Sequence, residues 1–412
     1  MIVTLLRTIA HSASRCLAVV ALLLAPFAGA QDAVRPDVGK PLQAAQELIK
    51  AQKYKDALVK IRDADAVANK TANESLLIER MRIAAASGAG DVETAAKSFE
   101  TLAASGKLAG PEKVRMVESI AGAYYRAKDY AKAMVWSQRY FKEGGTTPAI
   151  RTLLIQSQYL SGDFSGAAKE LTTEIQAAEK AGTPPPQERL NLLLNAGTQM
   201  KDTNTTVYAL ERLVTYYPKK EYWVDLLSRM QRKPNFSDRL ALDTYRLSLA
   251  TGSMTAANDF MEMAQLAVQA GLPAEGKQVI DKGFATGVLG NGAEGERHKR
   301  LRDLVGKRLA EYQLARPAAE KEAAADKDGT ALVNAGFNLV FSGQANTGLP
   351  MMQQGVAKGG LKRPDDAKLH LAIAYLMAGD SAKAQGILRS VGGADGTADL
   401  ARLWALYARR KS

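Results

Sequence analysis

The chain has 412 residues, of which 24% are charged and 6% are aromatic, and its formal net charge is +12. Its single cysteine excludes a scaffold held by disulfide bonds and zinc sites built from several thiolates. The basic balance suits acidic protein segments, anionic lipid head groups or wall polymers, and we expect no nucleic-acid partner.

Residues 1–30 have the pattern of a secretory signal peptide. Arg7 and Arg15 precede an apolar run that begins at Cys16, and Ala28-Gly29-Ala30 supplies the small residues of a cleavage site. The alternative is a membrane anchor, but the apolar run is short for crossing a bilayer. We therefore predict cleavage after Ala30 and, from the alanine-rich composition, export to the periplasm of a Gram-negative bacterium. Residues 31–40 are expected to form a short linker.

Small residues recur in pairs twelve positions apart. Small side chains allow two helices to approach closely, so this spacing across a tight turn predicts an antiparallel helical hairpin. Two further pairs have Ile at the first position, at Ile83 and Ile155. The pairs with two small residues are Ala45 with Ala57, Ala121 with Ala133, Gly197 with Ala209, Ala264 with Gly276, Gly336 with Gly348, and Ala372 with Ala384.

The segments between the paired residues contain turn signals. "GAGDVETA", "AKDYAKA" and "AGDSAKA" place Gly or Asp where one helix ends and Asp caps the next. Breakers such as "SGKLAGP", "GGTTP" and "GTPPP" then separate the hairpins. Apolar residues recur at helical spacing and no alternating run predicts a strand, so we expect an all-α chain.

Two intervals between hairpins are close to double the others. One degenerate unit is expected in residues 221–250, and another in the helix around 294–315 and the residues that follow it. The predicted divisions are an N-terminal array at 41–292, a long charged helix at 293–328, C-terminal hairpins at 329–395 and a capping helix at 396–412. In the capping helix, Leu403, Trp404 and Leu406 are expected to cover the open end of the last hairpin, ahead of a basic tail.

The stretch "SIAGAYYRAKDYAKAMVWSQRYFKEG" resembles a tetratricopeptide repeat, with Ala121, Tyr124, Tyr130 and Ala133 on that family's small and aromatic positions. "HLAIAYLMAGDSAKAQGIL" is similar, and the resemblance covers most of residues 40–392. It departs from the family in longer repeat intervals and in a poor match over 220–250. The resemblance implies a right-handed α-solenoid of about nine or ten hairpins, whose first helices line a groove for a partner segment.

Concentrated catalytic or metal-binding motifs are absent from the sequence. Beyond the predicted signal peptide it has two histidines, His298 and His370, and it lacks HExxH, GxSxG and a phosphate-binding Gly-Lys-Ser/Thr loop. We predict no enzymatic activity, no cofactor and no metal. His298 is expected to be solvated on a charged helix, and His370 to be packed within a helix.

The candidate partner-binding residues fall in three places. Tyr124, Tyr130, Trp136 and Tyr140 have the spacing of core residues, whereas Tyr125 lies off that face. The run "ERHKRLRDLVGKRL" is either a solvated helix surface or a docking patch for an acidic segment. The candidates are Tyr125, then Arg189, Asn191 and Asn195, and finally Arg297, Lys299 and Arg300.

These features together predict a non-catalytic protein–protein interaction scaffold of the periplasm, with envelope proteins as partners. The opening segment "RPDVGKPLQAAQELIKAQKYKDAL" resembles chains that accompany TonB-type transport components of the envelope. The main alternative is a peptidoglycan-associated protein or an adaptor for a wall enzyme. An enzyme with converging carboxylates in the groove and a small-molecule carrier are further alternatives.

Overall fold

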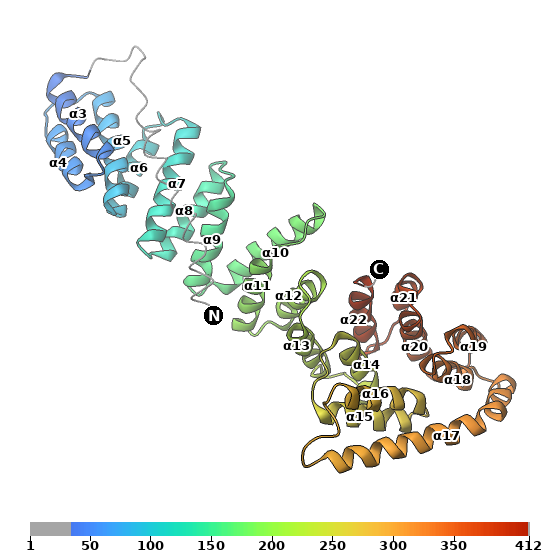
Figure 1. Ribbon diagram of the computed structural model, residues 1–412. Helices are drawn as coiled ribbons and strands as arrows, with labels where there is room; N and C mark the ends of the chain where they lie inside the picture. The colour runs from blue at the N-terminus through green and yellow to red at the C-terminus, as the bar shows by residue number, and fades with distance from the viewer. Residues whose placement is uncertain (1–33, 411–412) are drawn as a thin grey trace. The chain divides into compact units, whose positions relative to one another are not determined.

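The structure is a computed structural model that describes residues 34–410, so the predicted signal peptide and Lys411 lie outside the described residues. Within that range it contains twenty α-helices and no strand. The chain divides into two compact units, residues 1–174 and 175–412. The units are described separately below, and Figure 1 labels their helices.

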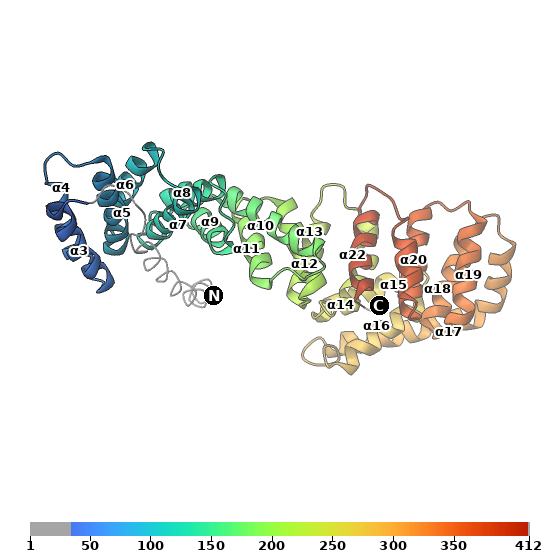
Figure 2. The ribbon, with the colours of Figure 1, turned by 90° about the horizontal axis from the view of Figure 1, so that it is seen from above.

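Unit 1 is a succession of helical hairpins that pair α3 with α4, α5 with α6, and α7 with α8 (Figures 1 and 2). In the fourth hairpin, α9 is joined to the first part of α10 by the ion pair of Arg151 with Glu170. Each helix packs on neighbours one or two places away in the chain. The bounds are α3 (Pro36–Lys50), α4 (Tyr54–Asp65), α5 (Ala72–Ala89), α6 (Val92–Ala104), α7 (Gly110–Arg126), α8 (Tyr130–Lys142), α9 (Pro148–Leu160) and α10 (Phe164–Lys180).

The twelve-residue pairs mark the hairpins as predicted. Ala121 of α7 and Ala133 of α8 are both fully buried, so no side chain keeps the two helices apart. Asp129 caps α8 by accepting a hydrogen bond from the backbone N–H of Lys132, and Asp91 caps α6 in the same way. The predicted all-α array of tetratricopeptide-like hairpins is therefore confirmed.

The aromatic stretch of α7 and α8 forms core rather than a binding site. Tyr124, Trp136 and Tyr140 are buried, and the rings of Tyr124 and Trp136 stack with their centroids 6.3 Å apart. Phe99 of the preceding hairpin meets the edge of Trp136 at 5.3 Å. Core packing was predicted for these three residues and is confirmed. The fourth, Tyr130, is only half-buried.

A buried carboxylate fixes the start of α3 against α5. Glu74 accepts hydrogen bonds from the Nε and Nη2 atoms of Arg35, at 3.0 and 2.8 Å, and from the backbone N–H of Thr71. The Arg35 guanidinium, followed by the Thr71 N–H, lowers the pKa of Glu74 to about 2.

Because the pKa of Glu74 is lowered by folding, its contribution to stability is present above the ordinary carboxyl pKa and is lost as pH falls toward 2. We expect the melting temperature of the natural protein to fall between about pH 5 and pH 2 more steeply than that of Glu74→Gln. Thermal unfolding followed by circular dichroism at several pH values measures this. Parallel pH profiles for the two proteins would contradict it.

Unit 2 contains five hairpins and two single helices within its described residues, in addition to the end of α10. The hairpins pair α11 with α12, α13 with α14, α15 with α16, α18 with α19, and α20 with α21. Their bounds are α11 (Gln187–Gln199), α12 (Thr203–Tyr216), α13 (Lys220–Gln231), α14 (Ala241–Thr251), α15 (Ala257–Gln269), α16 (Pro273–Ala285), α18 (Thr330–Phe341), α19 (Ala345–Lys358), α20 (Pro364–Met377) and α21 (Ser381–Leu388). The single helices are α17 (Gly295–Ala325) and α22 (Thr397–Arg409).

The two degenerate units predicted from the long intervals have different outcomes. Residues 221–250 do form a helical pair, α13 and α14, joined through a 3₁₀ helix at Asp238–Leu240. The second is not a hairpin, because α17 continues for 31 residues without a turn and the next helix, α18, is already paired with α19. The array therefore has nine hairpins in the described part of the chain.

The backbones of α18 and α19 approach each other closely where the two helices cross, at Gly336 and Gly348. A Cβ atom added to Gly336 would lie 2.6 Å from the carbonyl oxygen of Gly348, which is closer than atoms can approach. The same holds in reverse for Gly348 against Gly336. Only glycine fits at both positions, which explains why this twelve-residue pair carries no alanine.

The C-terminal helix α22 packs on two separate parts of unit 2. It contacts α20 and α21, as a cap on the last hairpin would, and it also contacts α12 and α14 (Figures 1 and 2). Lys233 pairs with Asp399 at 2.9 Å, and the backbone N–H of Ser237 donates to the carbonyl of Asp395. The helix α22 thus covers the last hairpin, with Leu403 and Trp404 buried, and it also joins the end of the chain to helices much earlier in the sequence.

Within residues 34–410, no helix combines the length and the apolar content that a membrane crossing requires.

Candidate partner-binding surface

The first helices of unit 1 are linked along one face by polar side chains. Arg80 of α5 donates through Nε to Glu112 of α7 at 2.7 Å. Tyr125 of α7 donates through its hydroxyl to Gln156 of α9 at 2.9 Å. We call the surface made by α5, α7 and α9 along these contacts the first-helix face.

Arg115 and Glu118 lie on this face of α7, since they precede Tyr125 by ten and seven positions and so share its side of the helix. The Nε atom of Arg115 is buried and has no hydrogen-bond partner among the described residues. Glu118 is half-buried, forms no ion pair with any described residue, and burial raises the pKa of its carboxyl group. The two side chains are one helical turn apart, yet they do not pair with each other.

Leaving buried polar groups without partners costs free energy, commonly about 1–3 kcal/mol for each group. Folded proteins therefore rarely retain them unless a ligand or water satisfies them. Arg115 offers a donor and Glu118 an acceptor on the same side of α7 as Tyr125. The arrangement suits a polar or charged segment of backbone and side chains laid across α7.

Tyr125 was the only residue of this face singled out from the sequence. It is half-buried, its ring meets the edge of Tyr130 at 5.7 Å, and burial raises the pKa of its hydroxyl group. Sequence reasoning missed Arg115 and Glu118. The helical spacing back from Tyr125 contained the signal that would have found them.

The second candidate set lies on α11 in unit 2. The side-chain oxygen of Asn191 accepts a hydrogen bond from the hydroxyl of Tyr222 on α13 at 3.2 Å. Gln187 donates to the same hydroxyl at 3.2 Å. Arg189 and Asn195 are half-buried, and each is engaged in an interaction. Asn191 therefore holds α11 against α13, which reduces its availability to a partner.

The third set lies at the start of α17, also in unit 2. Arg297, Lys299 and Arg300 are exposed, but Arg297 pairs with Glu294 at 3.3 Å and Lys299 with Glu296 at 2.7 Å. Only Arg300 of the three has no ion-pair partner among the described residues. Lys299 also lines an open hollow together with Phe284, Gly287, Leu289, Gly290, Asn291, Arg302 and Asp303.

His298, which lies between these basic residues, was predicted to be solvated, but it is buried. It is 5% exposed, and its Nδ1 atom accepts a hydrogen bond from the backbone N–H of Gly290 at 3.1 Å. The prediction is wrong because His298 lies on the same side of α17 as Leu301 and Val305, which are buried. The candidate residues thus fall on three helices, and the sets on α11 and α17 belong to a different unit from Tyr125.

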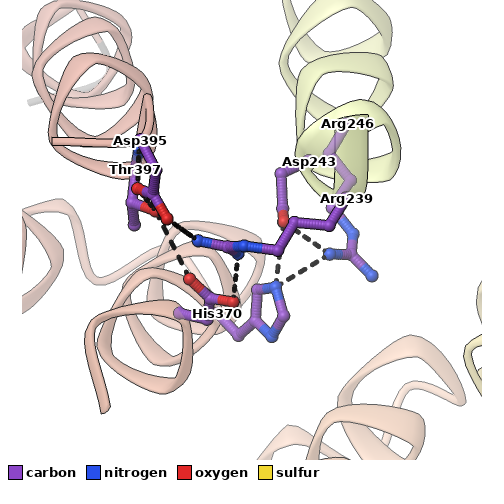
Figure 3. Close-up of polar contacts among 7 residues, drawn as sticks. Arg239, Asp243, Arg246, His370, Asp395 and Thr397 are labelled. Atoms are coloured by element: carbon purple, nitrogen blue, oxygen red, sulfur yellow. Dashed lines mark hydrogen bonds and ion pairs between the residues drawn. The ribbon is translucent and has the colours of Figure 1, made fainter. Parts of the chain in front are cut away.

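The strongest concentration of buried charge lies elsewhere in unit 2 (Figure 3). Arg246 of α14 donates to both oxygens of Glu275 of α16, at 2.7 and 2.6 Å, and to Asp243 at 2.6 Å. His370 of α20 lies 2.9 Å from Asp243, and its ring stacks on Phe337. His370 is thus packed, as predicted, and is also part of this charge network.

Burial by itself would raise the pKa of Asp243, but the charges of His370 and Arg246 outweigh it and hold that pKa well below its ordinary value. Beside this network, Arg239 pairs with Asp366 and Asp395 and donates to Thr397 at 3.0 Å. Each of these charges has a partner inside the protein. The network therefore ties α14 to α16 and α20, and nothing in it is left over for a ligand.

Among the residues described, no three His, Cys, Asp or Glu side chains are grouped closely enough to hold a metal ion.

No family model matches the sequence, and no curated protein matches it. Among solved structures, the chain is similar to yeast Tom70, with 10% identity, a TM-score of 0.25, and coverage of 90% of this chain and 96% of that chain. The P58(IPK) TPR domain and the apo form of RapI each show 11% identity and a TM-score of 0.22, covering 91% of this chain and 98% of theirs. At these TM-scores the likeness carries no argument about function.

Proposed function

We propose that the chain is a non-catalytic interaction scaffold that binds a segment of another protein on the first-helix face of unit 1. The observation that supports this most is that Arg115 and Glu118, both partly buried on the same side of α7 as Tyr125, are unpaired. A partner that places an acceptor on Arg115 and a donor on Glu118 would recover the hydrogen bonds that folding leaves unmade. Because packed helices hold these side chains, little ordering is needed on binding.

A second candidate surface is the start of α17, where Arg297, Lys299 and Arg300 would attract an acidic segment. Two of the three already have acidic neighbours on the same helix, which weakens the field they present. We infer that this patch contributes to the rate and charge preference of association more than to affinity.

We also propose that the protein works in the periplasm as an accessory to an envelope complex, of the kind that serves TonB-type transport. The signal-peptide pattern of residues 1–30 and the resemblance of the opening segment support this setting. The alternative is a peptidoglycan-associated protein or a wall-enzyme adaptor. Retention of the purified protein by isolated cell wall would favour that alternative.

The test is in-cell crosslinking of the tagged protein followed by mass spectrometry of the captured proteins. We expect one or a few envelope proteins, and we expect their recovery to fall at least about tenfold in Arg115→Glu and Glu118→Lys, as loss of a charged hydrogen bond predicts. The matched control is Lys97→Glu, an exposed charge on α6. Undiminished recovery in both variants would remove the first-helix face from consideration, and capture of wall fragments alone would favour the alternative.

A further inference from the structure

The linker between α13 and α14 reaches the start of α22, in a distant part of the sequence. We call residues 232–240 the strap, and residues 395–399, which lead into the first turn of α22, the α22 start. Arg239 of the strap pairs with Asp395 and donates to the hydroxyl of Thr397 at 3.0 Å (Figure 3). Since 156 positions separate Arg239 from Asp395, this contact closes unit 2 on itself.

Two more polar contacts join the strap to the α22 start. Lys233 pairs with Asp399, with Nζ and Oδ1 2.9 Å apart. The backbone N–H of Ser237 donates to the carbonyl oxygen of Asp395 at 2.9 Å. The second contact is a single backbone hydrogen bond between the two segments. The protection of one amide, that of Ser237, therefore reports whether the strap is in place.

The strap also approaches the backbone of the α22 start at a glycine. A Cβ atom added to Gly396 would lie 2.5 Å from the ring of Phe236, which is closer than atoms can approach. Gly396 also has a φ of +103°, in the region that favours glycine. The absence of a side chain at this position thus allows the ring of the strap to pack against the turn.

The polar contacts of the strap are partly exposed, unlike the network that ties α20 to α14. The side chains of Lys233 and Asp395 are each 43% exposed. Those of Arg246 and Glu275 are 3% and 0% exposed, and His370 joins α20 to that buried network. Exposed ion pairs contribute little to stability and are weakened by salt, whereas buried pairs are screened much less. The polar contacts of the strap are therefore easier to break than those that hold α20.

The chain just before the α22 start is attached to α20 and not to the strap. The backbone N–H of Gly392 donates to the carboxylate of Asp365, on α20, at 3.1 Å. The helix α22 itself packs on α20 and α21 as well as on α12 and α14. Loss of the strap contacts would therefore leave α22 supported by the last hairpin.

We propose that the strap is a salt-sensitive latch. Its contacts with the α22 start open reversibly while α22 stays helical and packed on α20 and α21, and the open form uncovers the sides of α12 and α14 that α22 covers in the closed form. Salt favours the open form because it screens the partly exposed ion pairs of Lys233 and Arg239. Such local opening costs less free energy than unfolding of the whole unit. The latch belongs to unit 2 and does not depend on the partner-binding role proposed for unit 1.

Hydrogen exchange of single amides, followed by NMR on the whole protein at about 0.05 M and about 0.5 M NaCl, tests the latch. We expect the Ser237 amide to exchange at least about fivefold faster at high salt. The Gly392 amide and the Leu400 amide, which donates within α22 to the carbonyl of Gly396 at 3.0 Å, should change less than about twofold. Equal acceleration of all three amides would overturn the proposal, because α22 and the last hairpin would then unfold together. A Ser237 amide that does not respond to salt would also overturn it.

A matched pair of substitutions on the strap tests which charge holds the latch closed. Arg239→Gln removes the partner of Asp395 and Asp366, and we expect the Ser237 amide to exchange at least about tenfold faster at low salt. Arg232→Gln makes the same chemical change at an exposed arginine that donates to Ser228 of its own helix, so it should leave this exchange unchanged. Unchanged exchange rates in α7 and α8 would show that both variants are folded. Equal effects of the two substitutions would contradict the assignment of Arg239 as the closing contact.

Discussion

Replacing Arg246 by Met is expected to destabilise unit 2 by about 3–5 kcal/mol, the usual cost of removing one partner from a buried ion pair. Arg246 is 4% exposed and is the partner of Glu275 and Asp243, which are also buried. Without the guanidinium, one carboxylate has no positive neighbour and the other keeps only His370. Urea unfolding together with hydrogen exchange in α14, α16 and α20 would measure the loss.

Two further variants make the Arg246 experiment decisive. Arg229→Met removes a partly exposed arginine whose pair with Asp225 lies on one helix, and it should cost less than about 1 kcal/mol. A triple variant with Arg246, Asp243 and Glu275 all replaced by apolar residues should regain much of the stability, because no buried charge is then unpaired. Equal losses of stability in Arg246→Met and Arg229→Met would show that the buried network contributes no more to stability than a partly exposed ion pair does.

Replacing Gly348 by Ala is expected to destabilise the α18–α19 hairpin by at least about 1–3 kcal/mol, the range found for overpacked cores. The added methyl group would strike the carbonyl of Gly336, which is backbone and moves only if the helices separate. Thermal unfolding compared with the natural protein measures the effect.

Gly386 is the matched control for this substitution. It lies in α21, is exposed, and has open space around the position of a Cβ atom. Gly386→Ala should therefore raise stability by up to about 1 kcal/mol through helix propensity alone. If Gly348→Ala proved as stable as Gly386→Ala, close backbone packing would not explain the glycine pair.

The hairpins could be predicted from the sequence because their determinants are local. The pairs of small residues, such as Ala121 with Ala133, and the capping aspartates, such as Asp129, lie within about a dozen positions of each other. Each hairpin signal is complete before any distant part of the chain is considered. The same locality explains why α17 was misjudged as part of a hairpin, since its charged sequence has no turn signal and no partner helix nearby.

Contacts across long separations could not be predicted in this way. His370 and Asp243 meet although 127 positions separate them, and Lys233 meets Asp399 across 166 positions. Nothing in the composition of either segment identifies its partner. His298 was misjudged for a different reason, because its helical spacing to the apolar residues Leu301 and Val305 is masked by the charged residues around it.

The candidate site was found only in part. Tyr125 was recognised because it departs from the core spacing of its aromatic neighbours. From the sequence, Arg115 and Glu118 look like ordinary charges on a solvated helix surface, and only the structure shows that both are partly buried and that neither is paired.

The position of α22 has a consequence for how each unit can change during evolution. In unit 1 each helix packs only on close neighbours, so duplicating or deleting one hairpin leaves the remaining contacts intact. In unit 2, α22 rests on α12 and α14 as well as on α20 and α21. One added hairpin would carry Asp399 out of reach of Lys233. Growth by repeat duplication is therefore open to unit 1, whereas the number of hairpins in unit 2 is fixed by the closure of its own ends.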